Sequence, residues 1–127
     1  MFWNKYLVPS VAVLLLVATL HAVFTRFDVY WTLRWVDIPV HILAGVWIIL
    51  TLAWILGWFF PETDISFARA IIWGLIVGGL WEIGELALGI NLATAHGYVA
   101  DTLKDLTNDF IGAAIGFLAV RWMKNKN

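Results

Sequence analysis

Apolar residues dominate four separate stretches of the chain, and most polar residues lie between or at the ends of these stretches. A helix needs about 20 mostly apolar residues to cross the hydrocarbon core of a membrane. The pattern therefore predicts four membrane-spanning helices, at about Tyr6 to Phe24, Ile38 to Phe60, Phe67 to Ile90 and Leu106 to Met123. The first stretch is too long for a secretory signal peptide and lacks a clear cleavage site, so we interpret it as a retained helix.

Residues that favour helix starts precede the later helices. Pro39 is expected in a first turn, where its missing N–H costs nothing. Ser66 is placed to cap the third helix. Either Asp101 or Thr102 is placed to cap the fourth, and Thr102 and Asp105 have the spacing of a capping box.

Four spans put both chain ends on the same side of the membrane, and Lys and Arg are enriched on the cytoplasmic side. The basic residues divide five against three: Lys5, Arg69, Arg121, Lys124 and Lys126 on the side of the termini, and Arg26, Arg34 and Lys104 on the other. We therefore expect an all-α integral membrane four-helix bundle with both termini in the cytoplasm. Residues 1–127 form its single domain. The connection before the fourth helix is expected to hold an interfacial turn of helix at residues 98–103.

Composition supports the membrane assignment and excludes several classes of function. Hydrophobic residues make up 62% of the chain and charged residues only 13%, whereas soluble domains carry roughly a quarter charged residues. Nine Trp residues suit the aromatic belts at membrane surfaces. The absence of Cys excludes disulfides and thiolate metal sites. A net charge of -1 without a basic run gives no indication of nucleic acid.

Polar residues within the predicted helices converge on one face of the membrane. Because successive helices alternate in direction, the starts of the second and fourth helices lie at the same depth as the end of the third and the end of the first, where His21 lies. The residues at this depth are Asp37, His41, Glu82, Glu85, Asp101, Asp105, Asn108 and Asp109. With the termini in the cytoplasm, they lie near the extracytoplasmic face. His21 and His96 are interpreted as incidental, His21 as a hydrogen-bonded membrane residue and His96 as a loop residue.

The spacing places these polar residues on one side of each helix. The steps are four residues from Asp37 to His41, three from Glu82 to Glu85, and four along Asp101, Asp105 and Asp109. Residues three or four apart share a helix face, and such a face should point into the bundle rather than to lipid. Small residues that allow close helix approach occur at Ala44, Gly45, Gly74, Gly78, Gly112 and Gly116.

The acids on this face outnumber the basic residues that could neutralise them. Arg26, Arg34 and Lys104 lie on the same side, and Asp28 competes for them. Buried carboxylates without partners are costly, so they pair, protonate or bind a cation. We therefore predict a divalent metal site for Mg, Mn, Zn, Fe or Ca. Its expected ligands are His41, Glu82, Glu85, Asp105 and Asp109, with Asp37 and Asp101 as outer ligands.

Simpler roles compete with metal binding at several of these positions. Asp37, Asp101 and Asp105 have the alternative role of helix caps or first-turn acids. Glu82 and Glu85 lie too deep in an apolar stretch to cap a helix. Their alternative is to share protons or to pair with Arg34 or Lys104.

Three short runs near the predicted site form a pattern. They are Asp37-Ile38-Pro39-Val40-His41, then Trp81-Glu82-Ile83-Gly84-Glu85, then Asp101-Thr102-Leu103-Lys104-Asp105-Leu106 with Asp109, Gly112 and Gly116 after it. The pattern covers the last three helices and resembles the VanZ-like and YjdF-like group of small bacterial membrane proteins. The two acids Glu82 and Glu85 resemble the YjdF-like branch more. The resemblance implies a protein of the cell envelope, in the bacterial cytoplasmic membrane, with a site that opens to the outer leaflet.

The leading hypothesis is a metal-dependent intramembrane hydrolase or transferase that acts on a phosphate-containing membrane lipid or a lipid-linked envelope precursor. The metal would activate water, and Glu82 or Glu85 would serve as general base. One alternative is proton or cation transport by a homo-oligomer, since intramembrane acids also serve such pathways. Another is a non-catalytic assembly protein whose polar cluster fixes the helix register.

Overall fold

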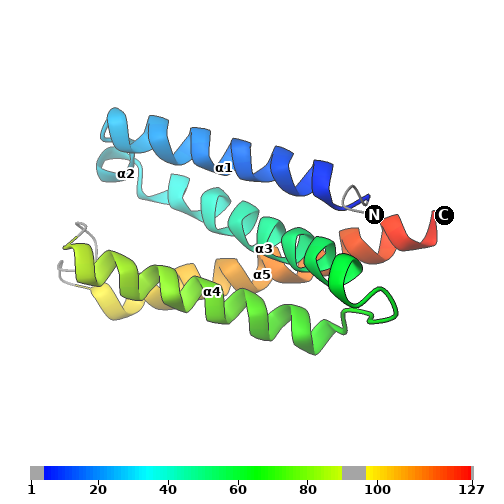
Figure 1. Cartoon of the computed structure of the whole chain (residues 1–127). Coiled ribbons are helices and arrows are strands. Elements are labelled where there is room, and N and C mark those ends of the chain that lie inside the picture. The colour runs from blue at the N-terminus through cyan, green and yellow to red at the C-terminus, as the bar shows by residue number, and fades with distance from the viewer. Residues whose placement is uncertain (1–4, 90–96, 127) are drawn as a thin grey trace.

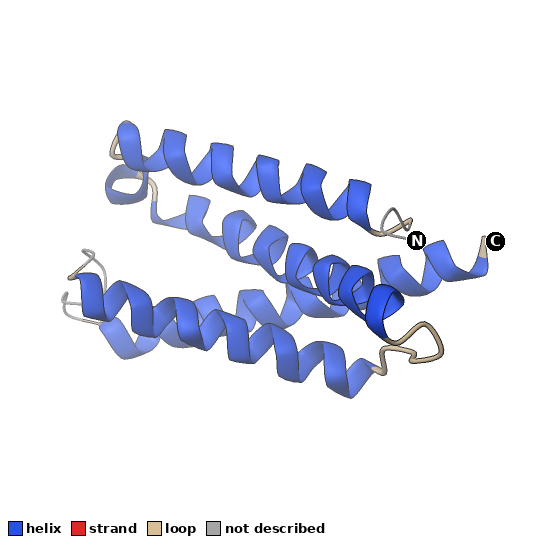
Figure 2. Cartoon of the chain, viewed as in Figure 1, coloured by secondary structure: helices blue, strands red, loops and turns tan. Residues whose placement is uncertain are grey.

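The structure is a computed structural model that describes residues 5–89 and 97–126. Every regular element in this part of the chain is a helix (Figure 2), as the sequence predicts. The long helices are α1 (Leu7–Arg26), α3 (Asp37–Phe59), α4 (Phe67–Leu88) and α5 (Tyr98–Asn125). The short helix α2 (Val29–Thr32) and the 3-10 turn η1 (Arg34–Val36) connect α1 to α3.

Three helical segments in the described ranges are long and apolar enough to cross a membrane. They are α1, Arg34–Phe59 and α4. Large apolar side chains cover their outer surfaces; Leu15 and Leu80, for example, are each 62% exposed. Such surfaces suit contact with lipid chains, because every backbone group is already bonded within its helix. Helix α5 has 28 residues but carries charges in its first turns, so the fourth span stays a prediction.

Helix α3 lies at the centre of the arrangement (Figure 1). It packs against α1 on one side, and against α5 and α4 on the other, while α4 also packs against α5. The buried core forms where α3 meets α5, around Ile49, Leu50, Ala53 and Ala113. The termini lie at one end of the helices, and α2 lies at the opposite end.

Glycines bring α3 and α5 into direct backbone contact. A Cβ atom on Gly45 would lie 2.6 Å from the carbonyl oxygen of Asp109 and 2.8 Å from the Cα of Gly112. On α4, a Cβ on Gly74 would lie 2.6 Å from that of Ala113, and one on Gly78 would collide with the Asp109 carboxylate. The glycines predicted to allow close helix approach therefore do so, and they bring Asp109 close to both α3 and α4.

Helix α5 begins much earlier than the sequence pattern predicted. The expected start at Leu106 is wrong, because the helix runs without interruption from Tyr98. Gly97 precedes it with φ 97°, a left-handed conformation that glycine adopts without steric cost. The interfacial turn expected at residues 98–103 is therefore the start of α5 itself.

Helix α4 follows its prediction closely. The Ser66 side chain accepts a hydrogen bond from the Arg69 N–H at 3.3 Å, so the predicted cap is confirmed. The helix ends at Leu88, and Gly89 follows with φ 64°, as is usual at helix ends. Ile90 and His96 lie outside the described residues.

Candidate metal centre

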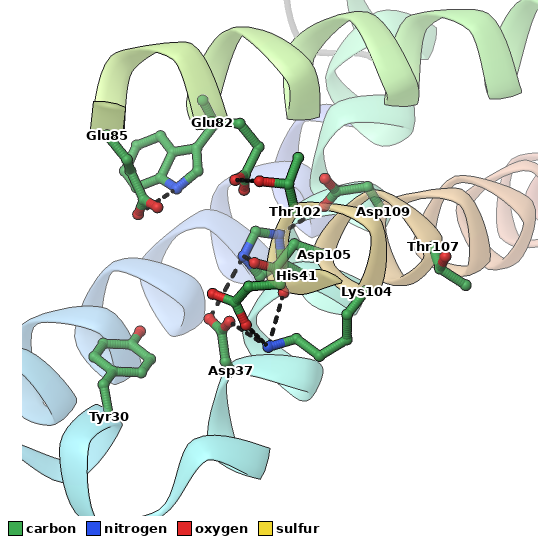
Figure 3. A network of polar contacts seen from close by, with 12 residues as sticks. Tyr30, Asp37, His41, Glu82, Glu85, Thr102, Lys104, Asp105, Thr107 and Asp109 are labelled. Carbon is green, nitrogen blue, oxygen red and sulfur yellow. Dashed lines mark hydrogen bonds and ion pairs between the residues drawn. The ribbon is translucent and has the colours of Figure 1, made fainter. Parts of the chain in front are cut away.

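His41 is the central residue of the polar cluster (Figure 3). Its ring atom Nδ1 lies 3.1 Å from Oδ1 of Asp109 on α5. Its Nε2 lies 3.5 Å from Oδ1 of Asp37 and 3.8 Å from Oδ2 of Asp105. All four residues are at most 9% exposed. One imidazole therefore meets three carboxylates, two of them at the same nitrogen.

The helix geometry explains why these residues meet. Asp37 and His41 lie one turn apart on α3, and Asp105 and Asp109 lie one turn apart on α5, so each pair shares a face. The glycine contact at Gly45, one turn after His41, holds the two faces close together. The predicted convergence of polar residues from these two helices is therefore confirmed.

Lys104 supplies a positive charge to the same cluster. Its ammonium group lies 2.7 Å from Asp101, 3.2 Å from Asp105 and 3.3 Å from Asp37. The carboxylates of Asp37 and Asp105 thus lie between two nitrogen-bearing side chains, His41 on one side and Lys104 on the other. Lys104 is one of the three basic residues expected on this side of the membrane, and its position here reduces the charge deficit at these acids.

Of the simpler roles considered for Asp37, Asp101 and Asp105, helix capping is wrong, whereas a first-turn position is confirmed for Asp37 and Asp101. Asp37 is the first residue of α3; the cap position belongs to Val36, and no side chain caps that end. Asp101, Thr102 and Asp105 lie inside α5, which starts after Gly97 and also lacks a side-chain cap. Their side chains instead make tertiary or intrahelical polar contacts.

The two glutamates of α4 differ in their contacts: Glu82 bonds to α5, whereas Glu85 bonds within its own helix. Glu82 is 5% exposed, and its Oε2 accepts a hydrogen bond from the Thr102 hydroxyl at 3.1 Å. Glu85 accepts a hydrogen bond from the indole N–H of Trp81, one turn earlier, at 2.9 Å. Among the described residues, no ion pair joins either glutamate to Arg34 or Lys104, so that alternative is wrong here.

The arrangement of donors fits a small cation. Asp37, His41 and Asp105 each offer one atom, and these three atoms lie within 4.8 Å of one another. Carboxylate and imidazole are common ligands of Zn, Mn and Fe ions. Several buried polar atoms around them also have no hydrogen-bond partner within the described part of the chain: Glu82 Oε1, Asn108 Nδ2 and Asp109 Oδ2. Asp37, His41 and Asp105 could therefore hold a metal ion.

Two polar residues outside the predicted site face it across a cavity. His21 on α1 hydrogen-bonds through Nδ1 to the Tyr30 hydroxyl at 3.0 Å, and the Trp81 ring stands edge-on to His21 at 5.8 Å. Burial, with Asp37 and Glu85 nearby, raises the pKa of Tyr30 to about 12. Tyr30 therefore keeps its proton at neutral pH. The sequence interpretation of His21 as a hydrogen-bonded membrane residue at the depth of the site is correct. Its partner Tyr30 was not predicted, because Tyr30 lies on the short helix α2.

A model of the family described as "Predicted membrane protein (DUF2238)" matches residues 4–126. The chain belongs to DUF2238. This membership supports a membrane protein and does not test the finer resemblance to the VanZ-like or YjdF-like groups. No curated protein and no solved structure matches the chain.

Proposed function

We propose that this DUF2238 protein is a metal-dependent membrane protein whose metal is bound by Asp37, His41 and Asp105. The observation that carries the proposal is the orientation of His41. Its Nε2 faces the two candidate carboxylate ligands, while Nδ1 is held by Asp109 at 3.1 Å. A carboxylate on the second ring nitrogen fixes the tautomer and orientation of many metal-binding histidines. Asp109 would thus position the ligand rather than bind the metal.

The remaining acids would act around this centre. Asp101 lies 2.7 Å from the Lys104 ammonium group. It would hold this positive charge in place beside Asp37 and Asp105. Glu82 and Glu85 approach from α4 and remain the candidates for the general base. Glu82 has one buried oxygen without a partner, which is the atom available to accept a proton.

The chemistry that such a site supports is hydrolysis or transfer on a phosphate-containing lipid or lipid-linked precursor. A bound divalent ion would neutralise phosphate charge and activate water. Three protein ligands would leave coordination positions for water and substrate. The proposal includes α5 as a fourth span and places both termini in the cytoplasm of a bacterium. The site then opens to the outer leaflet, where such lipids are found.

The position of Lys104 favours a second candidate, a structural polar cluster without a metal. Its ammonium group already contacts Asp37, Asp101 and Asp105. In that case the charge network would hold α3 against α5. Substitutions that neutralise one of its charged residues would then lower the stability of the protein rather than its activity. Removal of Lys104 would then leave the buried carboxylates of Asp37 and Asp105 without this compensating charge, and the fold would lose stability.

Metal content distinguishes the two candidates. Protein purified in mild detergent is incubated with Mg, Mn or Zn, desalted, and analysed by elemental mass spectrometry. We expect a stoichiometric ion in the wild type and its loss in His41→Gln and in Asp37→Asn/Asp105→Asn. Asp64→Asn is the matched control, because it removes a carboxylate that pairs with Lys124 instead of the cluster.

Two further variants sharpen the result. Glu82→Gln/Glu85→Gln should keep the ion if the three-residue centre is complete, and should lose it if the wider set predicted from sequence binds the metal. Lys104→Met should keep the ion under the metal proposal. Equal metal content at background level in every variant, together with a large loss of stability in Lys104→Met, would establish the structural cluster instead.

A further inference from the structure

A cavity of about 620 Å³ lies beside the candidate metal centre. Helix α1 forms one wall, α4 forms the opposite wall, and α3 forms the floor between them. Its volume falls in the range of small-molecule binding sites. We call it the α1–α4 chamber.

The α1–α4 chamber is apolar along most of its length and acidic at one end. The apolar part is formed by Leu14, Val17, Ala44, Trp47, Ile48 and Val77. The other end carries the carboxylates of Asp28, Asp37, Glu85 and Asp109. A site with this division suits an amphiphile whose chain lies in the apolar part and whose head lies among the carboxylates.

We propose that the α1–α4 chamber binds a membrane lipid with an ammonium head group. The acyl chain lies along the apolar walls of α1, α3 and α4, and the ammonium group lies at the acidic end, between Glu85 and Asp109. The proposal rests on the proposed function only in treating this lipid as the substrate of that site. Binding itself requires no metal.

Charge favours a cationic head group. No Lys or Arg lines the chamber within the described ranges, and Lys104 lines a different, smaller cavity on the other side of Asp37. Asp109 is 1% exposed, and its Oδ2 has no hydrogen-bond partner among the described residues although Asp109 lines the chamber. A buried carboxylate in this state favours a nearby positive charge, whereas an anionic head group would add to the repulsion.

Aromatic rings surround the same end. Tyr30 and Trp81 line the chamber together with His21, which contacts both rings. The Trp81 indole is held by its hydrogen bond to Glu85, so a ring face and a carboxylate are presented together. Aromatic faces attract ammonium groups, and this attraction strengthens away from water. The combination is the reason for assigning an ammonium group rather than a neutral polar head.

Native mass spectrometry in mild detergent with EDTA tests the proposal without any metal. The probes are lysophosphatidylethanolamine and lysophosphatidylglycerol with the same acyl chain. We expect one lysophosphatidylethanolamine per chain, bound about tenfold more tightly than lysophosphatidylglycerol, a ratio that corresponds to about 1.4 kcal/mol. Glu85→Gln should reduce this preference, because it removes a charge at the acidic end.

A matched pair of substitutions on α1 tests the location. Ala18 lines the chamber and Ala12 does not, although both belong to the same exposed helix. Ala18→Phe should weaken lysophosphatidylethanolamine binding, and Ala12→Phe should leave it unchanged; thermal unfolding confirms that both variants are folded. Equal affinity for the two probes, or equal effects of the two substitutions, would overturn the proposal. Because EDTA is present throughout, either outcome leaves the metal proposal to its own test.

Discussion

Substitution of Gly45 by alanine tests the contact on which the whole site depends. The added Cβ would lie 2.6 Å from the carbonyl oxygen of Asp109, and 2.8 Å from both the Ala113 nitrogen and the Gly112 Cα. All three are backbone atoms, so no side-chain rotation can relieve the clash, and α5 must move away from α3. Overpacking of this kind costs about 3 kcal/mol at the upper end of its usual range. Alanine also has a better helix propensity than glycine, which offsets about 1 kcal/mol of this loss. We expect a net loss of about 2 kcal/mol in the free energy of unfolding.

The assay is thermal unfolding in mild detergent, and Gly79→Ala is the matched control. A Cβ on Gly79, in the middle of α4, would meet no atom within 4 Å. This control carries the same propensity gain without the clash, so its stability should equal or exceed that of the wild type. If Gly45→Ala proved as stable as Gly79→Ala, α3 and α5 would not be in backbone contact, and the distances around His41 would lose their basis.

The same pair of variants also links stability to the site. Displacement of α5 would move Asp109 and Asp105 away from His41, which lies one turn before Gly45 on α3. Metal content should therefore fall in Gly45→Ala and not in Gly79→Ala. Loss of stability with unchanged metal content would show that the ion does not depend on the α3–α5 contact.

Two further predictions concern single contacts. Thr102→Val removes the hydroxyl that donates a hydrogen bond to Glu82, whose other carboxylate oxygen already lacks a partner. The free energy of unfolding should fall by about 1–3 kcal/mol. Thr102→Ser keeps the hydroxyl and should stay close to wild type in the same unfolding assay. Lys124 forms a hydrogen bond with Asp64 that lowers the pKa of this exposed carboxyl. A lowered pKa stabilises the fold above the ordinary carboxyl pKa of about 4, and the contribution disappears as the pH falls through the lowered value. The unfolding temperature of Asp64→Asn should therefore lie slightly below that of wild type at neutral pH and should converge with it in acid.

The sequence predicted the helices well where the pattern was strongly apolar. The expected starts and ends of α1, α3 and α4 lie within two residues of the observed ones in the described ranges, because lipid-facing helices must be apolar over a fixed length. The start of α5 was missed, since its first turns carry Asp101, Lys104 and Asp105. A charged segment of this kind indicates a loop or a helix cap when only the sequence is known, because the tertiary partners of its side chains are not visible there.

The need for tertiary information also explains which site residues could be predicted from the sequence. The meeting of His41, Asp37, Asp105 and Asp109 follows from helical spacing together with the apolar surroundings. Each i, i+4 pair shares one helix face, and a polar face turns away from lipid toward the neighbouring helices. The pairing of Thr102 with Glu82 and the approach of Tyr30 to His21 depend on how α4 and α2 are rotated. No periodicity in the sequence encodes those rotations.

The extended start of α5 changes the physical character of the site. Had the helix begun at Leu106, Asp101 and Lys104 would belong to a loop, and their contacts would be open to water. As part of the helix, Lys104 lies one turn after Asp101 and directly beside Asp105, so the carboxylates meet a cation that the fold itself supplies. A divalent ion must then bind next to this ammonium group, or displace it from Asp37 and Asp105. Lys104→Met should for this reason tighten metal binding, as judged by the metal retained at increasing chelator concentration. A variant that released its metal more readily than wild type would show instead that Lys104 organises the ligands.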